Sequence, residues 1–208
     1  MKVNWPERLW VNSPVRRYVQ QQEGRFFKNM NNLAPGGKIL EIGCGCGVGA
    51  NIINQTFAPA SIHALDIDVD MLRGAQKKRK LWKNVPLHLL AADAQELPFP
   101  DNCFDAVFNF GIIHHLENWQ KGVSEITRVL KEDGIFFFEE IYPPLYANPL
   151  FLRILDHPRE NRFYGPEFRA ELGASGLRIF EGYKESRFAI LGAAVKESIM
   201  PEVRLKAV

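Results

Sequence analysis

Glycines near the start of the chain have the spacing of a ligand-binding loop. The run GCGCGVG places glycine at 43, 45, 47 and 49, directly after the apolar segment KILEI (38–42). Glycine lets the backbone turn sharply and lets a ligand approach the main chain without meeting a β-carbon. A helix that follows such a loop begins with unpaired amides and a partial positive charge, which suits a carboxylate or phosphate.

Three carboxylates accompany this loop. Glu41 lies two residues before Gly43, Asp66 ends the next apolar segment, and Asp93 with Ala94 follows the third. Asp66 suits a ribose diol, and Asp93 with Ala94 suits an adenine edge. Three acids around one ligand favour a cationic group and oppose a diphosphate. The pattern therefore favours a sulfonium cofactor.

The same loop leaves a second interpretation open. Gly45, Gly47 and Ala50 fit the G-x-G-x-x-A spacing of dinucleotide sites, and Asp66 follows about 20 residues later, as such sites require. A NAD-dependent oxidoreductase of Rossmann type is the alternative.

Alternating strands and helices position these residues. We predict an α/β fold in which a doubly wound, mostly parallel sheet carries helices on both faces. The expected strands are 38–42, 62–65, 85–90, 104–110, 134–141, 177–183 and 187–194, and the expected helices are 15–33, from the glycine loop to about 57, 69–81, 119–130 and 166–175.

The bulk properties indicate one ordinary domain. The 208 residues include 46% hydrophobic residues, and the formal net charge is only +2, too little to indicate a nucleic-acid partner. The longest apolar runs fall short of the ~20 residues of a membrane span. Cys44 and Cys46 lack the usual spacing of a zinc or redox pair, so we expect no metal, and reduced thiols in a cytoplasmic protein.

Four segments together resemble a known family. KILEIGCGCG, ALDID, AADAQELPFPDNCFDAVFNFGIIHHL and RVLKEDGIFFFEE follow the order and spacing of the motifs of class I S-adenosylmethionine-dependent methyltransferases, over about Lys38 to Glu140. The chain is most similar to the small-molecule type, such as the ubiquinone/menaquinone biosynthesis methyltransferases. The resemblance implies a Rossmann-like sheet of seven strands, the last antiparallel and inserted between its neighbours.

The resemblance also implies residues for the methionine part of S-adenosylmethionine. Gly43, Cys44 and Gly45 would line it, and Glu41 would hold its amino group, directly or through water. Asn109, near the end of the fourth strand, would close the site beside the methionine.

The adenosine part has its own implied residues. Asp66 would bind the ribose hydroxyls, Ile67 would pack on the adenine, and Asp93 and Ala94 would contact the adenine amine and ring. A cofactor-binding relative without catalytic activity would keep the same residues, so it remains an alternative.

Methyl transfer from a sulfonium is an in-line displacement, and alignment of the acceptor supplies much of the rate. His114 and His115 follow the fourth strand and are the candidates for a base or an orienting group. Either can instead serve packing.

The parts outside the resemblance are expected to form the acceptor pocket. We predict that the N-terminal helix with Trp5 and Trp10 and the segment 142–164, which includes Phe151 and Leu152, form this pocket. The segment 142–164 would be an apolar or aromatic lid over the methyl group, which favours a lipophilic or aromatic small molecule. In the alternative, this segment packs on the edge of the sheet. The domain would then consist of 1–34, a cofactor core at 38–141, the lid, and a C-terminal part at 165–208.

Overall fold

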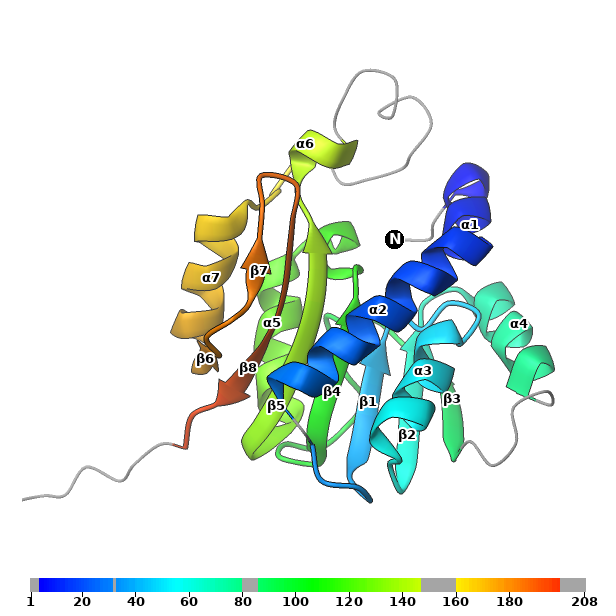
Figure 1. Ribbon diagram of the computed structural model, residues 1–208, viewed down its shortest axis with the longest axis horizontal. Helices are drawn as coiled ribbons and strands as arrows, with labels where there is room; N and C mark the ends of the chain where they lie inside the picture. Colours follow the sequence, from blue (N-terminus) through cyan, green and yellow to red (C-terminus); the bar gives the residue numbers. More distant parts are fainter. Residues whose placement is uncertain (1–3, 32, 80–85, 147–159, 199–208) are drawn as a thin grey trace, which may run out of the picture.

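The centre of the molecule is an eight-stranded sheet. The computed structural model describes residues 4–31, 33–79, 86–146 and 160–198. The strands lie in the order β3-β2-β1-β4-β5-β8-β6, and β7 pairs with β8 outside this path (Figure 1). Their bounds are β1 Lys38–Ile42, β2 Ser61–Asp66, β3 Leu87–Ala91, β4 Phe104–Phe110, β5 Leu130–Ile141, β6 Leu177–Ile179, β7 Lys184–Glu185 and β8 Ala189–Lys196.

The pairing confirms the predicted doubly wound sheet. Strands β1 to β5 pair in parallel. Strand β8 runs antiparallel between β5 and β6. The last strand is therefore inserted between its neighbours, as the resemblance implied. The two-residue strand β7, which pairs antiparallel with β8, was not predicted.

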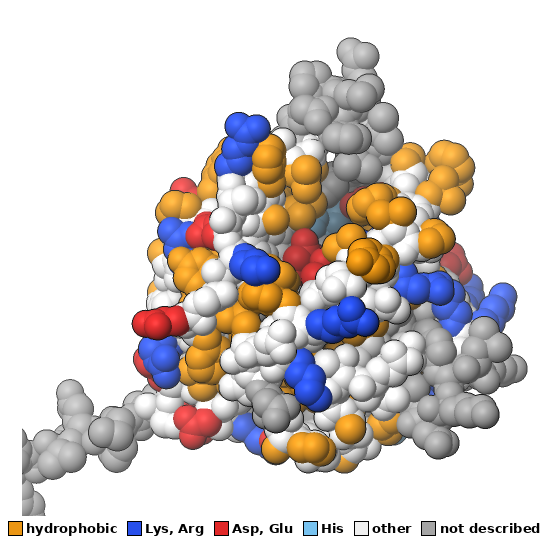
Figure 2. Space-filling model, viewed as in Figure 1, with side chains coloured by type: hydrophobic (Ala, Val, Ile, Leu, Met, Phe, Trp, Pro, Cys, Tyr) orange, Lys and Arg blue, Asp and Glu red, His pale blue; other side chains and the backbone are white. Residues whose placement is uncertain are grey.

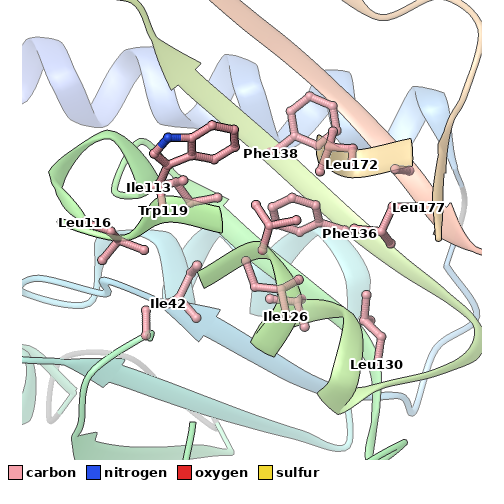
Figure 3. Close-up of a cluster of buried hydrophobic side chains, with 14 of the residues drawn as sticks. Ile42, Ile113, Leu116, Trp119, Ile126, Leu130, Phe136, Phe138, Leu172 and Leu177 are labelled. Atoms are coloured by element: carbon pink, nitrogen blue, oxygen red, sulfur yellow. The ribbon is translucent and has the colours of Figure 1, made fainter. Parts of the chain in front are cut away.

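Helices cover both faces of the sheet (Figure 1). Helices α2 Pro14–Met30, α3 Val48–Phe57 and α4 Val69–Arg79 contribute Phe27, Ile53 and Leu72 to one apolar cluster. Helices α5 Trp119–Val129 and α7 Gly165–Ala174 cover the other face, where Figure 3 shows Trp119, Ile126 and Leu172 packed on the strand side chains. Short helical turns lie at Ile113–His115 (η1) and Pro143–Tyr146 (α6).

Strand β5 shows why the centre of the sheet is buried on both sides. Phe136, Phe137 and Phe138 are fully buried, and successive side chains of a strand point to opposite faces. A strand between two helical layers is apolar where both of its faces are covered, as in the segment 135–138 of β5. The strand begins at Leu130, four residues before its predicted start, because Leu130 pairs with Phe104. A register shift separates this pair from the next one, Ala106 with Ile135.

Two helices precede the sheet, where one was predicted. Helix α1 Trp5–Val11 is capped by Asn4, whose Oδ1 accepts from the Glu7 amide at 3.2 Å. Ser13 caps α2, since its Oγ accepts from the Arg16 amide at 3.1 Å. Among the described residues, no helix has the length and apolar character needed to cross a bilayer.

Candidate functional site

A cavity of about 130 Å³ lies at the carboxyl ends of β1, β2, β3 and β4. The order of the strands reverses between β1 and β4, and open α/β sheets bind ligands at this switch point. The cavity is lined by the strand-end loops on one side and by the N-terminal helices on the other; its lining includes Val11, Asn12, Arg16, Gln20, Gly43, Cys44, Gly45, Asp66, Ile67, Asp93, Ala94, Gly111, Ile112 and His115.

The glycine loop needs its glycines for two reasons. Gly43 has a φ of 64° and Gly45 a φ of 51°, in the left-handed region that favours glycine. A β-carbon at residue 43 would also clash with the side chain of Ile112. The loop after β1 therefore lies directly against the loop after β4.

Asp66 ties the glycine loop to the end of β2. Its Oδ2 accepts from the Gly45 amide at 2.8 Å, and its Oδ1 accepts from the Asp68 amide at 2.8 Å. Burial raises the pKa of Asp66, and these two amides oppose the rise. Each carboxylate oxygen keeps capacity for a further hydrogen bond, because an ionised carboxylate accepts about four.

The end of β3 supplies a second carboxylate. Asp93 Oδ1 accepts from the Gln95 amide at 2.8 Å, and the Gln95 side-chain amide lies 3.2 Å from both carboxylate oxygens. Asp93, Ala94 and Ile67 all line the cavity, so the structure brings together the four residues predicted for an adenosine group.

Glu41 lies behind the cavity wall instead of in it. Its side chain is buried, and a β-carbon on the lining residue Gly49 would clash with its Oε1. Burial, and then the charge of Asp66, raises the pKa of Glu41 well above its usual value. Its Oε2 has no hydrogen-bond partner among the described residues. Only the backbone of Gly49 thus separates the Glu41 carboxyl group from the cavity.

Asn109 is also absent from the lining. Its Nδ2 donates to Glu140 Oε1 at 2.6 Å and to the Glu139 carbonyl at 3.1 Å, and its Oδ1 accepts from the Ile112 amide at 2.9 Å. The side chain therefore holds the loop after β4, and this loop, not Asn109 itself, forms the wall.

Glu140 organises the histidine turn and was not predicted. Its Oε1 also accepts from the Ile113 amide at 2.7 Å, and its Oε2 lies 2.6 Å from His114 Nδ1. Burial raises the pKa of Glu140 to about 7, against the opposing effect of its hydrogen bonds. Burial lowers the pKa of His114 well below its usual value, so this imidazole is neutral at pH 7.

The two histidines take different positions. His115 lines the cavity, and its Nε2 lies 3.2 Å from Glu7 Oε1. His114 lies one layer deeper, with ring centroids 4.2 Å from His115 and 5.5 Å from Tyr146. Figure 2 shows acidic and histidine side chains in the hollow beside α2.

Helix α2 contributes a buried charge cluster to the same wall. Arg16 Nη1 lies 2.6 Å from Glu23 Oε1, and its Nη2 lies 3.0 Å from Glu139 Oε2 and from the Phe110 carbonyl. All three charged side chains are largely buried. Sequence reasoning missed this cluster. The available signals were two adjacent acids, Glu139 and Glu140, directly after the apolar run 135–138, because acids in a buried strand are costly without partners.

The expected aromatic cover is partly wrong. Trp5 and Trp10 are exposed and do not line the cavity. The N-terminal residues that do line it are Val11, Asn12, Arg16 and Gln20. At the proposed lid, Tyr146 packs beside His114, whereas Phe163 packs in the core against Trp119. Phe151 and Leu152 lie outside the described residues.

Comparison with known proteins adds a family. A profile described as a methyltransferase domain matches residues 40–138. The chain is 35% identical over 108 residues to a fatty-acid O-methyltransferase of Mycolicibacterium smegmatis. This alignment covers 52% of this chain and 38% of the relative. It is 34% identical over 109 residues to the phthiotriol/phenolphthiotriol dimycocerosates methyltransferase of Mycobacterium tuberculosis, covering 52% and 39%. The chain thus spans about two fifths of the length of these curated relatives.

A solved structure supports the fold over nearly the whole chain. A SAM-dependent methyltransferase from Aquifex aeolicus superposes with a TM-score of 0.70 at 19% identity, covering 92% of this chain and 97% of that one.

Proposed function

Because residues 40–138 form a methyltransferase domain of the class I S-adenosylmethionine-dependent family, we propose that this protein transfers a methyl group from S-adenosylmethionine to a lipophilic small molecule. The observation that carries the proposal is the convergence of the glycine loop, Asp66 and Asp93 on one cavity at the switch point of the sheet. The cofactor supplies an electrophilic methyl group on a positively charged sulfur.

The residues of the cavity fit this cofactor. Asp66 and Asp93 are assigned to the ribose and the adenine amine, and Ile67 and Ala94 to the faces of the adenine. The bare backbone of Gly43 to Gly45 leaves room for the methionine chain. The buried Glu41 carboxyl, with one oxygen lacking a described partner, is suited to the amino group through a water or a small shift at Gly49. The first amides of α3 and the Arg16 guanidinium offer positive charge to the carboxylate.

The acceptor is assigned to the side of the cavity that holds the histidines. The lining there combines apolar residues such as Val11, Ile112 and Leu116 with His115. The two curated relatives named above are methyltransferases of a fatty acid and of dimycocerosates, which agrees with a lipophilic acceptor.

The charges favour a hydroxyl group over a carboxylate as the accepting group. Glu7 and Glu140 lie on this side, and a carboxylate acceptor would meet their field. A hydroxyl must lose its proton during transfer, whereas a fatty acid is already ionised at pH 7. A base is therefore needed only for the hydroxyl.

His114 lies directly behind Gly111 of the lining, where an added β-carbon would come within 3.7 Å of His114 Cε1, and it is assigned as this base, with Glu140 as its positioning residue. Three N–H groups, from Asn109, Ile113 and His114, donate to Glu140 and oppose the effect of burial on its pKa, which is about 7, so the carboxyl group is ionised above this pH. The ionised carboxylate then holds a proton on His114 Nδ1, which leaves Nε2 as the basic nitrogen. His115, in the lining, is assigned to orienting the acceptor.

The first test is calorimetric titration with S-adenosylhomocysteine, and with NADH in a parallel cell. We expect binding of the first ligand alone, and a loss of about a hundredfold or more in Asp66→Ala, which removes charged hydrogen bonds to the ribose. Asp101→Ala, on an exposed turn, is the matched control and should bind normally. Binding of NADH alone would move Gly45, Gly47 and Asp66 into a dinucleotide site.

The second test separates the accepting groups. Purified protein with labelled S-adenosylmethionine would be offered long-chain alcohols and phenols in one series and fatty acids of matched length in another. Methylation of the hydroxyl series is expected to fall about a hundredfold or more in His114→Gln. Turnover of fatty acids alone, unchanged in His114→Gln, would refute the assignment of a base.

A further inference from the structure

The outer face of α1 and of the first turns of α2 is apolar and exposed. Trp5 is 72% exposed and Tyr18 is 63% exposed, and the other members of this surface are Leu9, Trp10, Val15 and Val19. We call these six residues the outer apolar face. Figure 2 shows hydrophobic side chains gathered over α1 and the adjoining part of α2. A continuous apolar patch of this kind marks an interaction site more often than a chance exposure.

The same two helices form a wall of the cavity from their inner side. Val11, Asn12, Arg16 and Gln20 line the cavity, and Glu7 approaches His115. The helices are thus already docked on the protein through their polar and charged residues. The outer apolar face is therefore the side of α1 and α2 that points away from the rest of the protein, and it is not needed to hold these helices in place.

The acids of α1 and α2 are all on the inner side of these helices. Glu7 and Glu23 are buried and face inward, and Asp68 is buried beneath Arg8 as its ion-pair partner. Arg17, beside Tyr18, is exposed. The outward charge of the segment 4–24 is consequently positive, and no acid of the segment is exposed.

The basic end of α4 extends the positive charge. Lys78 Nζ lies 3.5 Å from Asn12 Oδ1, at the junction of α1 and α2, and Lys77 and Arg79 beside it are exposed. The exposed acid of α4, Asp70, lies at the other end of the helix, which contacts α1 through Arg8 and Asp68, and its charge is compensated by Arg73. Apolar aromatic side chains and lysine or arginine side chains thus occupy neighbouring parts of one surface.

We propose that the outer apolar face, together with Arg17 and the basic end of α4, binds the surface of a membrane that contains anionic lipids. Tryptophan and tyrosine place an apolar ring and a polar N–H or O–H at the boundary of headgroups and acyl chains. Arginine and lysine beside them are attracted to the negative surface potential. A second copy fits less well, because a two-fold contact would bring the cations of both copies together.

Such binding would let a lipophilic acceptor pass from the bilayer to the cavity. The helices that contact lipid are the ones that wall the cavity, so a lipophilic molecule leaving the bilayer would reach the cavity edge without crossing bulk water. This consequence rests on the proposed function, but the binding itself does not. Vesicle binding and cofactor binding are separate measurements, and either can fail alone.

The test is sedimentation of the purified chain with two kinds of vesicle: phosphatidylcholine alone, and phosphatidylcholine with phosphatidylglycerol in equal parts. We expect binding to the mixed vesicles, about tenfold weaker binding to phosphatidylcholine, and weakening by salt. Trp10→Ser with Tyr18→Ser should reduce binding about tenfold or more. Arg17→Glu with Lys77→Glu should reduce binding to the mixed vesicles alone.

A matched double variant provides the control. Tyr183 and Phe188 are exposed in the β7–β8 region, and Tyr183→Ser with Phe188→Ser should bind vesicles as the unmodified chain does. Light scattering gives the molar mass of every variant and so shows whether the outer apolar face binds a second copy of the chain. Absence of binding to mixed vesicles, equal binding by the Trp10 and Tyr18 variant, or a dimer that this variant dissociates would each overturn the proposal.

Discussion

The two walls of the cavity are built in different ways. The sheet wall, formed by the loops after β1, β2 and β3, is held by main-chain amides: Gly45 and Asp68 donate to Asp66, and Gln95 donates to Asp93. The helix wall, formed by α1 and α2 against the ends of β4 and β5, is held by buried ion pairs. Arg16 reaches Glu139, which is 123 residues away along the chain.

This difference separates a local device from a global one. A carboxylate that accepts from nearby amides is positioned as soon as its loop closes. A buried ion pair forms only when distant elements have met, and each partner left alone is costly to bury. We therefore expect the sheet wall to keep its structure when the contacts of the helices are lost. The helix wall is expected to lose its structure when a single buried charge is removed.

The largest expected effect comes from removing the Arg16 cation, which pairs with both Glu23 and Glu139 on the helix wall. Arg16→Met leaves Glu23 and Glu139 buried without their cation, and we expect a loss of about 3–5 kcal/mol in the free energy of unfolding. Urea denaturation measures it. Arg25→Met, an exposed arginine on the same helix, is the control. A loss under about 1 kcal/mol would show that the cluster is hydrated and that the two walls do not differ in this way.

The next effect concerns the place where the walls touch. Gly43→Ala introduces a β-carbon that clashes with Ile112 and a positive φ that alanine resists, so we expect a loss of about 2–4 kcal/mol and weaker binding of S-adenosylhomocysteine. The control is Gly173→Ala, within α7, where nothing lies within 4 Å of the added carbon. Equal stability of the two variants would contradict the close approach.

The pH dependence sharpens the comparison further. Burial, and then the charge of Glu139, raises the pKa of Glu23 from 4.5 to about 7, against the opposing effect of Arg16. The folded state then holds a proton that the unfolded state releases, so the stabilisation present below pH 4.5 is lost as the pH rises to about 7. We expect a fall on the order of 2 kcal/mol that Glu23→Gln removes. Denaturation across this range checks it, and parallel curves for both proteins would refute it.

The smallest effect on stability should come with a clear spectroscopic change. Glu140→Gln keeps one acceptor oxygen but replaces the other with an NH₂ group, which donates to His114 Nδ1 and moves the imidazole proton to Nε2. We expect a loss of about 1–2 kcal/mol. The ¹⁵N shifts of His114 should exchange between the two ring nitrogens. An unchanged tautomer would remove Glu140 from its positioning role.

The sequence predicted the sheet wall well because that wall is encoded locally. Glycines after a short apolar strand, and an acid at the end of the next two strands, define the loops without reference to the rest of the chain. Asn109 and Glu41 were located correctly along the strands. Whether they reach the cavity depends on other parts of the chain: the bare backbone of Gly49 lies in front of Glu41, and the loop after β4 lies in front of Asn109.

The helix wall could not be predicted in the same way. Arg16, Glu23, Glu139 and Glu140 show no short-range motif, and their pairing depends on how α2 crosses the sheet. Trp5 and Trp10 were placed wrongly because large aromatic residues usually pack inward, and a seven-residue helix is too short to show which of its faces is apolar.

The insertion of β8 beside β5 also has a consequence for biosynthesis. Chains emerge from the ribosome amino end first, so the phenylalanine-rich β5 must wait for residues 189–196 before its second edge is paired. During that interval the nascent chain presents an open, apolar strand edge, the kind that recruits other chains. Truncation before β8 should therefore yield aggregates or chaperone-bound chains, even though every residue that lines the cavity has already been made.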